Sequence, residues 1–181
     1  ILIHVSSVGE FEQAKPIIDG LRSLNKFEII VSFFSSSLEN KVKEDKSVHH
    51  SFYLPSDSKK NMELLLEKIN PVILLLIKYE YWRNFILSTN KKSIPIISVS
   101  SIFRKSQFYV PLYSYFFINT LKKINLFLVQ NNDSVNLLKK NNITRVKKVG
   151  DTRFDRVLKI YNDSKKYPLV EQFKKNKKTV I

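Results

Sequence analysis

Short apolar runs alternate with helix-like patterns along almost the whole chain, in units of about 25 residues. Runs of this length that are rich in Ile, Val, Leu and Phe are typical of buried strands. Neighbouring parallel strands need a crossover between them, usually a helix, so the alternation predicts an α/β fold with a doubly wound parallel sheet. The expected strands span residues 1–5, 27–34, 51–54, 72–77, 94–99, 126–130 and 145–149.

The segments between these runs carry apolar residues at helical spacing. The clearest pattern follows the first strand, where Phe11, Ala14 and Ile18 recur every three or four residues. Residues 56–58 (SDS) are typical of a helix start, and residues 70–71 (NP) of a helix end. Further helices are expected after the serines at 35–37, over about 110–123, over 133–140 and after residues 150–156.

Size and composition allow a folded domain and exclude several classes of protein. The chain has 181 residues, and 43% of them are hydrophobic, which is enough for a sizeable core. It contains no cysteine, and so neither disulfides nor a thiolate metal site. Its longest apolar runs, such as 72–77, are far shorter than the roughly 18 residues of a membrane span. Because it starts inside a strand without an initiator methionine, we expect a fragment.

The chain is strongly basic, with a formal net charge of +15. Such a charge favours binding to nucleic acid, but no helix-turn-helix, zinc-finger or RNA-recognition signature accompanies it. An anionic membrane surface or a phosphorylated substrate explains the charge at least as well. We therefore expect no nucleic-acid partner.

Residues 4–10 (HVSSVGE) form the corner between the first strand and the first helix. Ser6, Ser7 and Gly9 supply a turn that lets a ligand approach the backbone closely. Glu10 follows at the helix N-terminus, where the helix dipole favours its ionised form, so it can accept a proton. The alternative is a purely structural first-turn acid. Ser6 and Ser7 have no nucleophile elbow around them, so they are expected to cap rather than to attack.

Polar and charged residues also follow the other strands of the predicted sheet. Parallel strands end at one edge, so Ser35, Glu80 and Arg104 are expected to converge with Glu10 on a common cleft. Glu80 lies among aromatic residues, which either desolvate its carboxylate or simply pack around it. Arg104 and Lys105 could clamp a phosphate or form a solvated basic turn.

Two further features concern metals and domain organisation. None of the three histidines has the spacing of a metal ligand, so no metal site is expected. Residues 150–156 (GDTRFDR) read as a strand-end turn that leads into a helix, and a lysine-rich segment follows. We expect one domain over residues 1–164. Residues 165–181 are then a linker and the first strand of a second domain.

Four stretches together resemble the 3-deoxy-D-manno-octulosonic acid (Kdo) transferases: residues 4–10 with their helix, 78–84, 100–106 and 150–156. Their order and spacing match over nearly the whole chain, and residues 101–104 (SIFR) are similar to the variant found in Bacteroidetes-type bacteria. The resemblance implies the amino-terminal Rossmann-like domain of a two-domain GT-B glycosyltransferase of lipopolysaccharide biosynthesis. Such an enzyme transfers Kdo from CMP-Kdo to a lipid A precursor at the cytoplasmic face of the inner membrane.

The resemblance also assigns roles to residues. Glu10 falls on the catalytic base of the family, which takes the proton of the acceptor hydroxyl as this oxygen attacks the anomeric carbon, with inversion. Glu80 falls on a second acid, expected to support positioning or electrostatics. Ser7, Gly9 and Ser35 are expected to contact substrate. No cofactor is implied, because CMP-Kdo is a substrate bound by the second domain.

The match departs from the family pattern at two positions. Lys78 occupies the place of the first acid of the second motif, and Arg83 replaces the proline after its tryptophan. From charge alone, Lys15, Arg104 and Lys105 are candidates for contacts to acceptor phosphates.

Two other functions stay open from the sequence. One is a noncatalytic module that binds anionic lipid or nucleic acid through its basic surface. The other is a GT-B transferase that uses a different nucleotide sugar.

Overall fold

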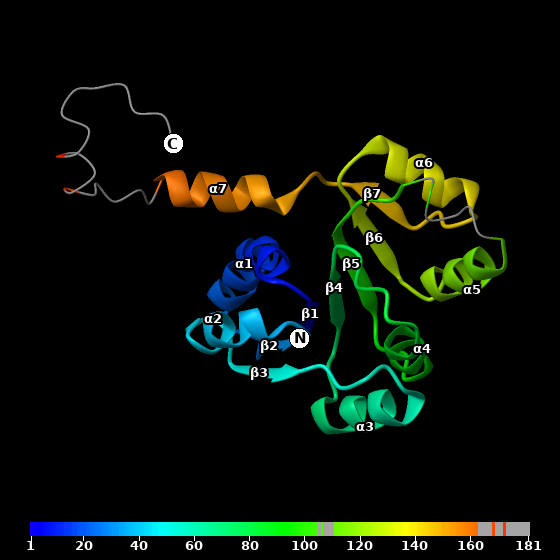
Figure 1. The fold of residues 1–181 in the computed structure, drawn as a ribbon, viewed down its shortest axis with the longest axis horizontal. Helices are drawn as coiled ribbons and strands as arrows, with labels where there is room; N and C mark the ends of the chain where they lie inside the picture. The colour runs from blue at the N-terminus through cyan, green and yellow to red at the C-terminus, as the bar shows by residue number, and fades with distance from the viewer. Residues whose placement is uncertain (105, 107–110, 163–167, 169–171, 173–181) are drawn as a thin grey trace.

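The computed structural model describes residues 1–104, 106, 111–162, 168 and 172. Its centre is a seven-stranded parallel sheet with the strand order β3-β2-β1-β4-β5-β6-β7 (Figure 1). The predicted alternation and the parallel sheet are therefore confirmed. The strands are β1 (Leu2–Val5), β2 (Ile30–Phe33), β3 (His50–Tyr53), β4 (Leu74–Ile77), β5 (Ile96–Ser101), β6 (Leu126–Val129) and β7 (Val146–Lys148).

Helices cover both faces of the sheet, and most of them lie where apolar spacing predicted them. They are α1 (Val8–Ser23), α2 (Glu39–Lys43) with a preceding 3-10 turn (Ser36–Leu38), α3 (Lys59–Ile69), α4 (Arg83–Lys91), α5 (Pro111–Leu121), α6 (Asn132–Lys140) and α7 (Thr152–Asn162). Helix α4 has no counterpart among the expected helices. Its last turns are rich in Ser, Thr and Asn, which have low helix propensity, so tertiary contacts must support it.

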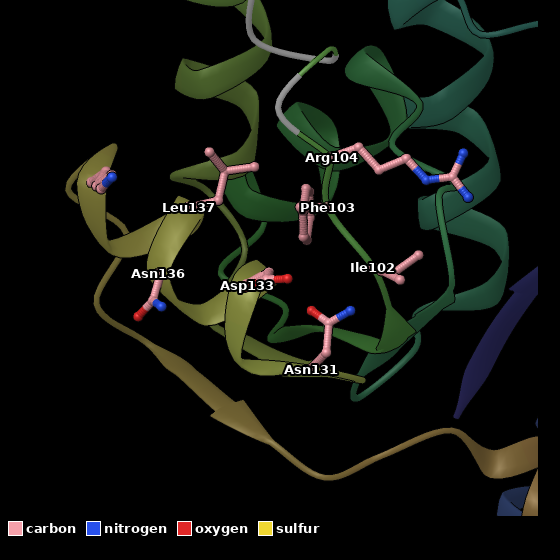
Figure 2. A pocket seen from close by; sticks show the side chains of 8 residues that line it. Ile102, Phe103, Arg104, Asn131, Asp133, Asn136 and Leu137 are labelled. Carbon is pink, nitrogen blue, oxygen red and sulfur yellow. The ribbon is translucent and has the colours of Figure 1, made fainter.

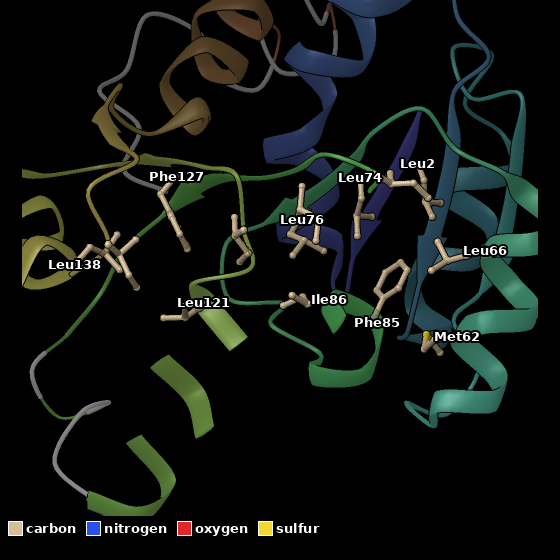
Figure 3. Packing of buried hydrophobic residues seen from close by; sticks show 14 of the residues in the cluster. Leu2, Met62, Leu66, Leu74, Leu76, Phe85, Ile86, Leu121, Phe127 and Leu138 are labelled. Carbon is tan, nitrogen blue, oxygen red and sulfur yellow. The ribbon is translucent and has the colours of Figure 1, made fainter. Parts of the chain in front are cut away.

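The core consists of two apolar layers, one on each face of the sheet. Helices α1 and α2 cover one layer, and α3 to α6 cover the other, which Figure 3 shows. Strands β1 and β4 are fully buried along their length because both layers pack against them. Their continuous apolar sequences follow from this position at the centre of the sheet.

The strand order has its switch point at the carboxyl ends of β1 and β4. From β1 the chain proceeds to β2 and β3 on one side, and then crosses to β4 on the other side of β1. Connections leave β1 and β4 in opposite directions at this switch point, which is where open α/β sheets bind ligands. The loops after β1 and β4 carry residues 6–10 and 78–82.

Asp57 caps α4 instead of α3. Ser58 is the N-cap of α3, and its hydroxyl accepts a hydrogen bond from the Asn61 backbone N–H at 3.2 Å. The carboxylate of Asp57 instead accepts the backbone N–H groups of Asn84 and Phe85 at 3.0 and 2.9 Å. The long-range cap explains how α4 forms without a capping side chain of its own.

We expect Asp57→Ala to destabilise α4 by about 1–2 kcal/mol, the usual cost of losing an N-cap. Asp57→Asn should have a smaller effect, since one oxygen still accepts. Amide hydrogen exchange of the full-length protein measures this local stability. Unchanged exchange rates in α4 of the alanine variant would contradict the assignment of the cap.

Helix α7 lies along α1 and is held there by charge. Arg156 contacts Glu12 at 2.5 Å, and Lys159 contacts Asp19 at 2.8 Å. None of its residues is buried, and it exposes Phe154 and Tyr161, each by more than 70% (Figure 1). The predicted domain boundary at residues 164 and 165 lies outside the described residues, as does Lys105. Among the described helices, none is long and apolar enough to cross a membrane.

Candidate active site

The turn after β1 is built around the start of α1. Ser7 is the N-cap: its carbonyl accepts the N–H groups of Glu10 and Phe11 at 3.1 and 3.0 Å, and its hydroxyl accepts that of Glu10 at 3.4 Å. A Cβ added at Gly9 would meet only the Ser7 hydroxyl, at 3.9 Å, which is an ordinary contact. Packing within the domain therefore does not require glycine here. Close approach by a ligand remains its predicted role.

The Glu10 carboxylate folds back over this turn. Its Oε2 accepts a hydrogen bond from the Ser6 backbone N–H at 2.6 Å, and the residue is only 8% exposed. Burial raises the pKa of Glu10 above its usual range, and the nearby negative charge of Glu80 raises it further; the Ser6 hydrogen bond, Lys78 and His4 oppose the shift. The helix dipole alone predicted the opposite direction. Desolvation dominates because the carboxylate, folded back over the turn, is buried.

Glu80 comes to the same turn from the loop after β4. Its Oε2 accepts hydrogen bonds from the hydroxyl of Ser6 and, at 2.7 Å, from Nε1 of Trp82. Burial alone would raise the pKa of Glu80, but the nearby His4 imidazole and the hydrogen bonds from Ser6 and Trp82 outweigh burial and lower it. The neighbouring indole is thus a donor that stabilises the ionised carboxylate, rather than an apolar wall that neutralises it.

Ser6 connects the two carboxylates. Its backbone N–H binds Glu10 and its hydroxyl binds Glu80, so one residue holds two acids whose pKa values are shifted in opposite directions. Such a pair separates roles: Glu80 remains the fixed anion, and Glu10 has the higher proton affinity expected of a general base. The structure brings the two predicted catalytic residues together.

Backbone strain lies at the same edge of the sheet. Lys78 has φ +60° directly after β4, and Ser100 has φ +55° at the end of β5. Side chains other than glycine occupy this region at a cost of about 1–3 kcal/mol, and such residues cluster at functional sites. Lys78, which replaces the first acid of the family motif, lowers the pKa of Glu10 through its positive charge.

We expect two substitutions to move the pKa of Glu10 in opposite directions. Glu80→Gln removes a negative charge and should lower this pKa, whereas Lys78→Met removes a positive charge and should raise it. Carbon-detected NMR titration of the Glu10 carboxyl group measures both. A shift of the Glu10 pKa in the same direction in both variants would show that a change in burial of Glu10, and not the removed charge, causes the shift.

The structure places one of the other predicted site residues at this turn and another one elsewhere. Ser35 lies against the turn, because its backbone N–H donates to the Ser6 carbonyl at 3.2 Å. Lys15 is occupied elsewhere: its ammonium group binds Asp19 at 2.6 Å and Asp45 at 2.9 Å. Among the described residues, neither contact leads to Glu10 or Glu80, and a phosphate would have to displace two carboxylates. The prediction from charge did not include these partners. Asp19 lies on the same helix as Lys15, and Asp45 lies in the loop before β3.

Arg104 lines a separate pocket of about 560 Å³ between the end of β5 and the start of α6. Figure 2 shows Asn131, the N-cap of α6, and Asp133 on α6 facing Ile102 and Phe103 across it, with Arg104 at its rim. The pocket lies at the carboxyl edge of the sheet, as predicted, but two strands away from β1.

Four residues near the site were not singled out from the sequence. The side chain of Gln13 is buried and donates to Asp151 Oδ1 at 2.8 Å. Ser100 donates to the same oxygen at 3.4 Å, so Asp151 joins α1 to the end of β5. His4 lies 3.6 Å from Glu80. The only signals were a polar residue within an apolar run (His4) and the motif at 150–156. No group of three or more His, Asp or Glu side chains within the described ranges forms a metal site.

Comparisons with known proteins agree with this arrangement. Residues 1–156 match the family model described as 3-deoxy-D-manno-octulosonic-acid transferase (kdotransferase). A bifunctional glycosyltransferase/methyltransferase of Fusobacterium nucleatum is 32% identical over 174 residues, which cover 92% of this chain and 27% of that protein. The chain thus spans about a quarter of the length of this relative.

Solved structures share the fold. The UDP-GlcNAc 2-epimerase of Methanocaldococcus jannaschii has a TM-score of 0.70 at 17% identity, covering 99% of this chain and 53% of the epimerase. The enzyme of Neisseria meningitidis, bound to UDP-GlcNAc, has a TM-score of 0.71 at 17% identity, covering 97% and 53%. At this identity they confirm the fold class, the Rossmann-like domain of a GT-B protein. On the family match over residues 1–156, the chain belongs to the 3-deoxy-D-manno-octulosonic-acid transferase family.

Proposed function

We propose that this chain is the acceptor-binding amino-terminal domain of an inverting glycosyltransferase that moves Kdo from CMP-Kdo to a lipid A precursor. The observation that carries the proposal is the pair of Glu10 and Glu80 at the switch point of a domain of this family. The backbone N–H of Ser6 binds Glu10, and its hydroxyl binds Glu80. A module that only binds polyanions has no need to bury one carboxylate, and partly bury a second, at its ligand edge.

The geometry suits proton abstraction from an acceptor hydroxyl. Glu10, with its raised proton affinity, takes the proton while the hydroxyl oxygen attacks the anomeric carbon of Kdo and CMP departs. Direct displacement with a single base inverts the configuration. The anomeric carbon has oxocarbenium-like character in such transition states, so the position of the base matters more than its strength. Glu80 holds the turn and supplies a fixed negative charge.

The basic surface fits an anionic acceptor at a membrane. Arg104, at the rim of the pocket beside α6, is a candidate for a phosphate contact. Helix α5 exposes Tyr115 and Phe116. Together with the net charge of +15, these rings support residence at the cytoplasmic face of the inner membrane. CMP-Kdo would bind a second domain, and no cofactor is proposed.

A second candidate is transfer of another nucleotide sugar by the same base. Lys78 in place of the first acid of the family motif favours it, since this residue acts on Glu10 directly. The experiment gives the full-length protein a lipid A precursor and either CMP-Kdo or UDP-GlcNAc, and follows sugar incorporation by mass spectrometry. Incorporation from CMP-Kdo alone supports the first proposal, and incorporation from UDP-GlcNAc alone supports the second. No incorporation from either donor contradicts the first proposal and excludes UDP-GlcNAc as the donor of the second.

A further inference from the structure

His4 lies in β1 with no exposed surface. Its Nδ1 is 3.1 Å from the carbonyl oxygen and 3.0 Å from the hydroxyl of Ser32, its register partner on β2. Its Nε2 lies 3.6 Å from Oε2 of Glu80 and makes no hydrogen bond to any described residue. A buried polar atom without a partner costs about 1–3 kcal/mol, so this nitrogen calls for an explanation.

The partners of the ring constrain its tautomer. The Glu80 carboxylate only accepts, so the contact with it is favourable when Nε2 carries the ring hydrogen. The Ser32 hydroxyl, 3.0 Å from Nδ1, can donate to that nitrogen when it is bare. The tautomer with hydrogen on Nε2 therefore gives the ring a donor–acceptor contact at each nitrogen.

We propose that His4 is a positioning residue that directs Nε2–H to the Glu80 carboxylate while Ser32 holds the ring at Nδ1. The inference rests on the proposed function, because Glu80 binds the Ser6 hydroxyl, and the Ser6 N–H binds the base, Glu10. The ring is oriented by the edges of Trp82 and Phe85, with centroids 6.2 and 6.0 Å away.

The contact belongs to a charged network. Glu80 faces His4 directly, and the charges of Glu10 and Lys78 belong to the same network. A side chain without a donor at the position of Nε2 leaves Glu80 without this contact. We therefore expect transfer to fall when this donor is removed.

The first experiment reads the ring directly and does not depend on transfer. Long-range ¹H–¹⁵N NMR of the histidine-labelled full-length protein, with His4 assigned by its loss in His4→Asn, should show hydrogen on Nε2. In Glu80→Gln, the amide can donate to Nε2, and the hydrogen of His4 should move to Nδ1. A bare Nε2 in the unmodified protein would overturn the proposal, even if transfer of Kdo were established.

The second experiment uses two substitutions that each keep one end of the ring. His4→Gln places a permanent donor near the position of Nε2, whereas His4→Asn keeps only the contact with Ser32. We expect His4→Asn to lower kcat about tenfold or more with little change in KM, and His4→Gln to recover most of this loss. Equal activities in the two variants would overturn the positioning role. If either variant fails to fold by circular dichroism, the NMR comparison with Glu80→Gln decides.

Discussion

Replacement of Glu10 by glutamine is expected to lower kcat for sugar transfer by about 10²–10⁴-fold, the usual contribution of a general base. Glutamine keeps the size of the side chain, and its amide oxygen can still accept the Ser6 N–H that binds the carboxylate at 2.6 Å. The turn should therefore survive while the proton acceptor is lost. The effect is measured as the rate at which the full-length protein transfers the sugar to a lipid A precursor at a saturating concentration of the donor.

The pH profile supplies a second test of this role. The base must be ionised, and burial raises the pKa of Glu10. In the unmodified enzyme kcat/KM should thus rise as pH increases through this raised pKa and be lost below it. Glu10→Gln should remove this limb together with the activity.

Glu12 offers a matched control two residues along the same helix. Its carboxylate binds Lys41 and Arg156 on the surface of the domain, with its pKa lowered by both cations against the effect of burial. Glu12→Gln should weaken ion pairs worth about 0–1 kcal/mol each and leave kcat nearly unchanged. If Glu12→Gln lost as much activity as Glu10→Gln, loss of the base would not explain either result.

Replacement of Phe85 by alanine is expected to cost about 3–5 kcal/mol of unfolding free energy. Phe85 has no exposed surface, and its ring lies in the apolar layer under α3 and α4 (Figure 3). Its edge also contacts the ring of His4, at a centroid distance of 6.0 Å. The cavity should therefore loosen His4, and through it Glu80, in addition to destabilising the domain.

Phe127 separates these two effects. It is equally buried in the same layer, on β6, where its ring contacts Tyr81 and Phe103. Phe127→Ala should cost a similar free energy, measured by hydrogen exchange of amides in β4, but it should leave the His4 resonances in place. If both variants shifted the His4 resonances equally, the contact between Phe85 and His4 would not explain the effect of Phe85→Ala on His4.

The sequence by itself predicted the sheet, most of the helices and the meeting of Glu10 with Glu80. Periodicity reports local burial, and strands buried on both faces, such as β1 and β4, are read directly from continuous apolar runs. Once such strands are parallel, their carboxyl ends must share one edge. Two acids that follow two central strands therefore converge whatever their distance along the chain. Helix α4 was missed because its own residues favour a helix only weakly.

Only the tertiary structure decided the partners of each side chain. Lys15 looked available for a phosphate until Asp19 and Asp45 were found to hold it. Asp57 looked like a cap for the helix that follows it and instead caps α4. The opposite pKa shifts of Glu10 and Glu80 depend on Ser6, Trp82 and His4 converging around two carboxylates. Such contacts join residues far apart in sequence, and strand order and register select them, which local periodicity does not encode.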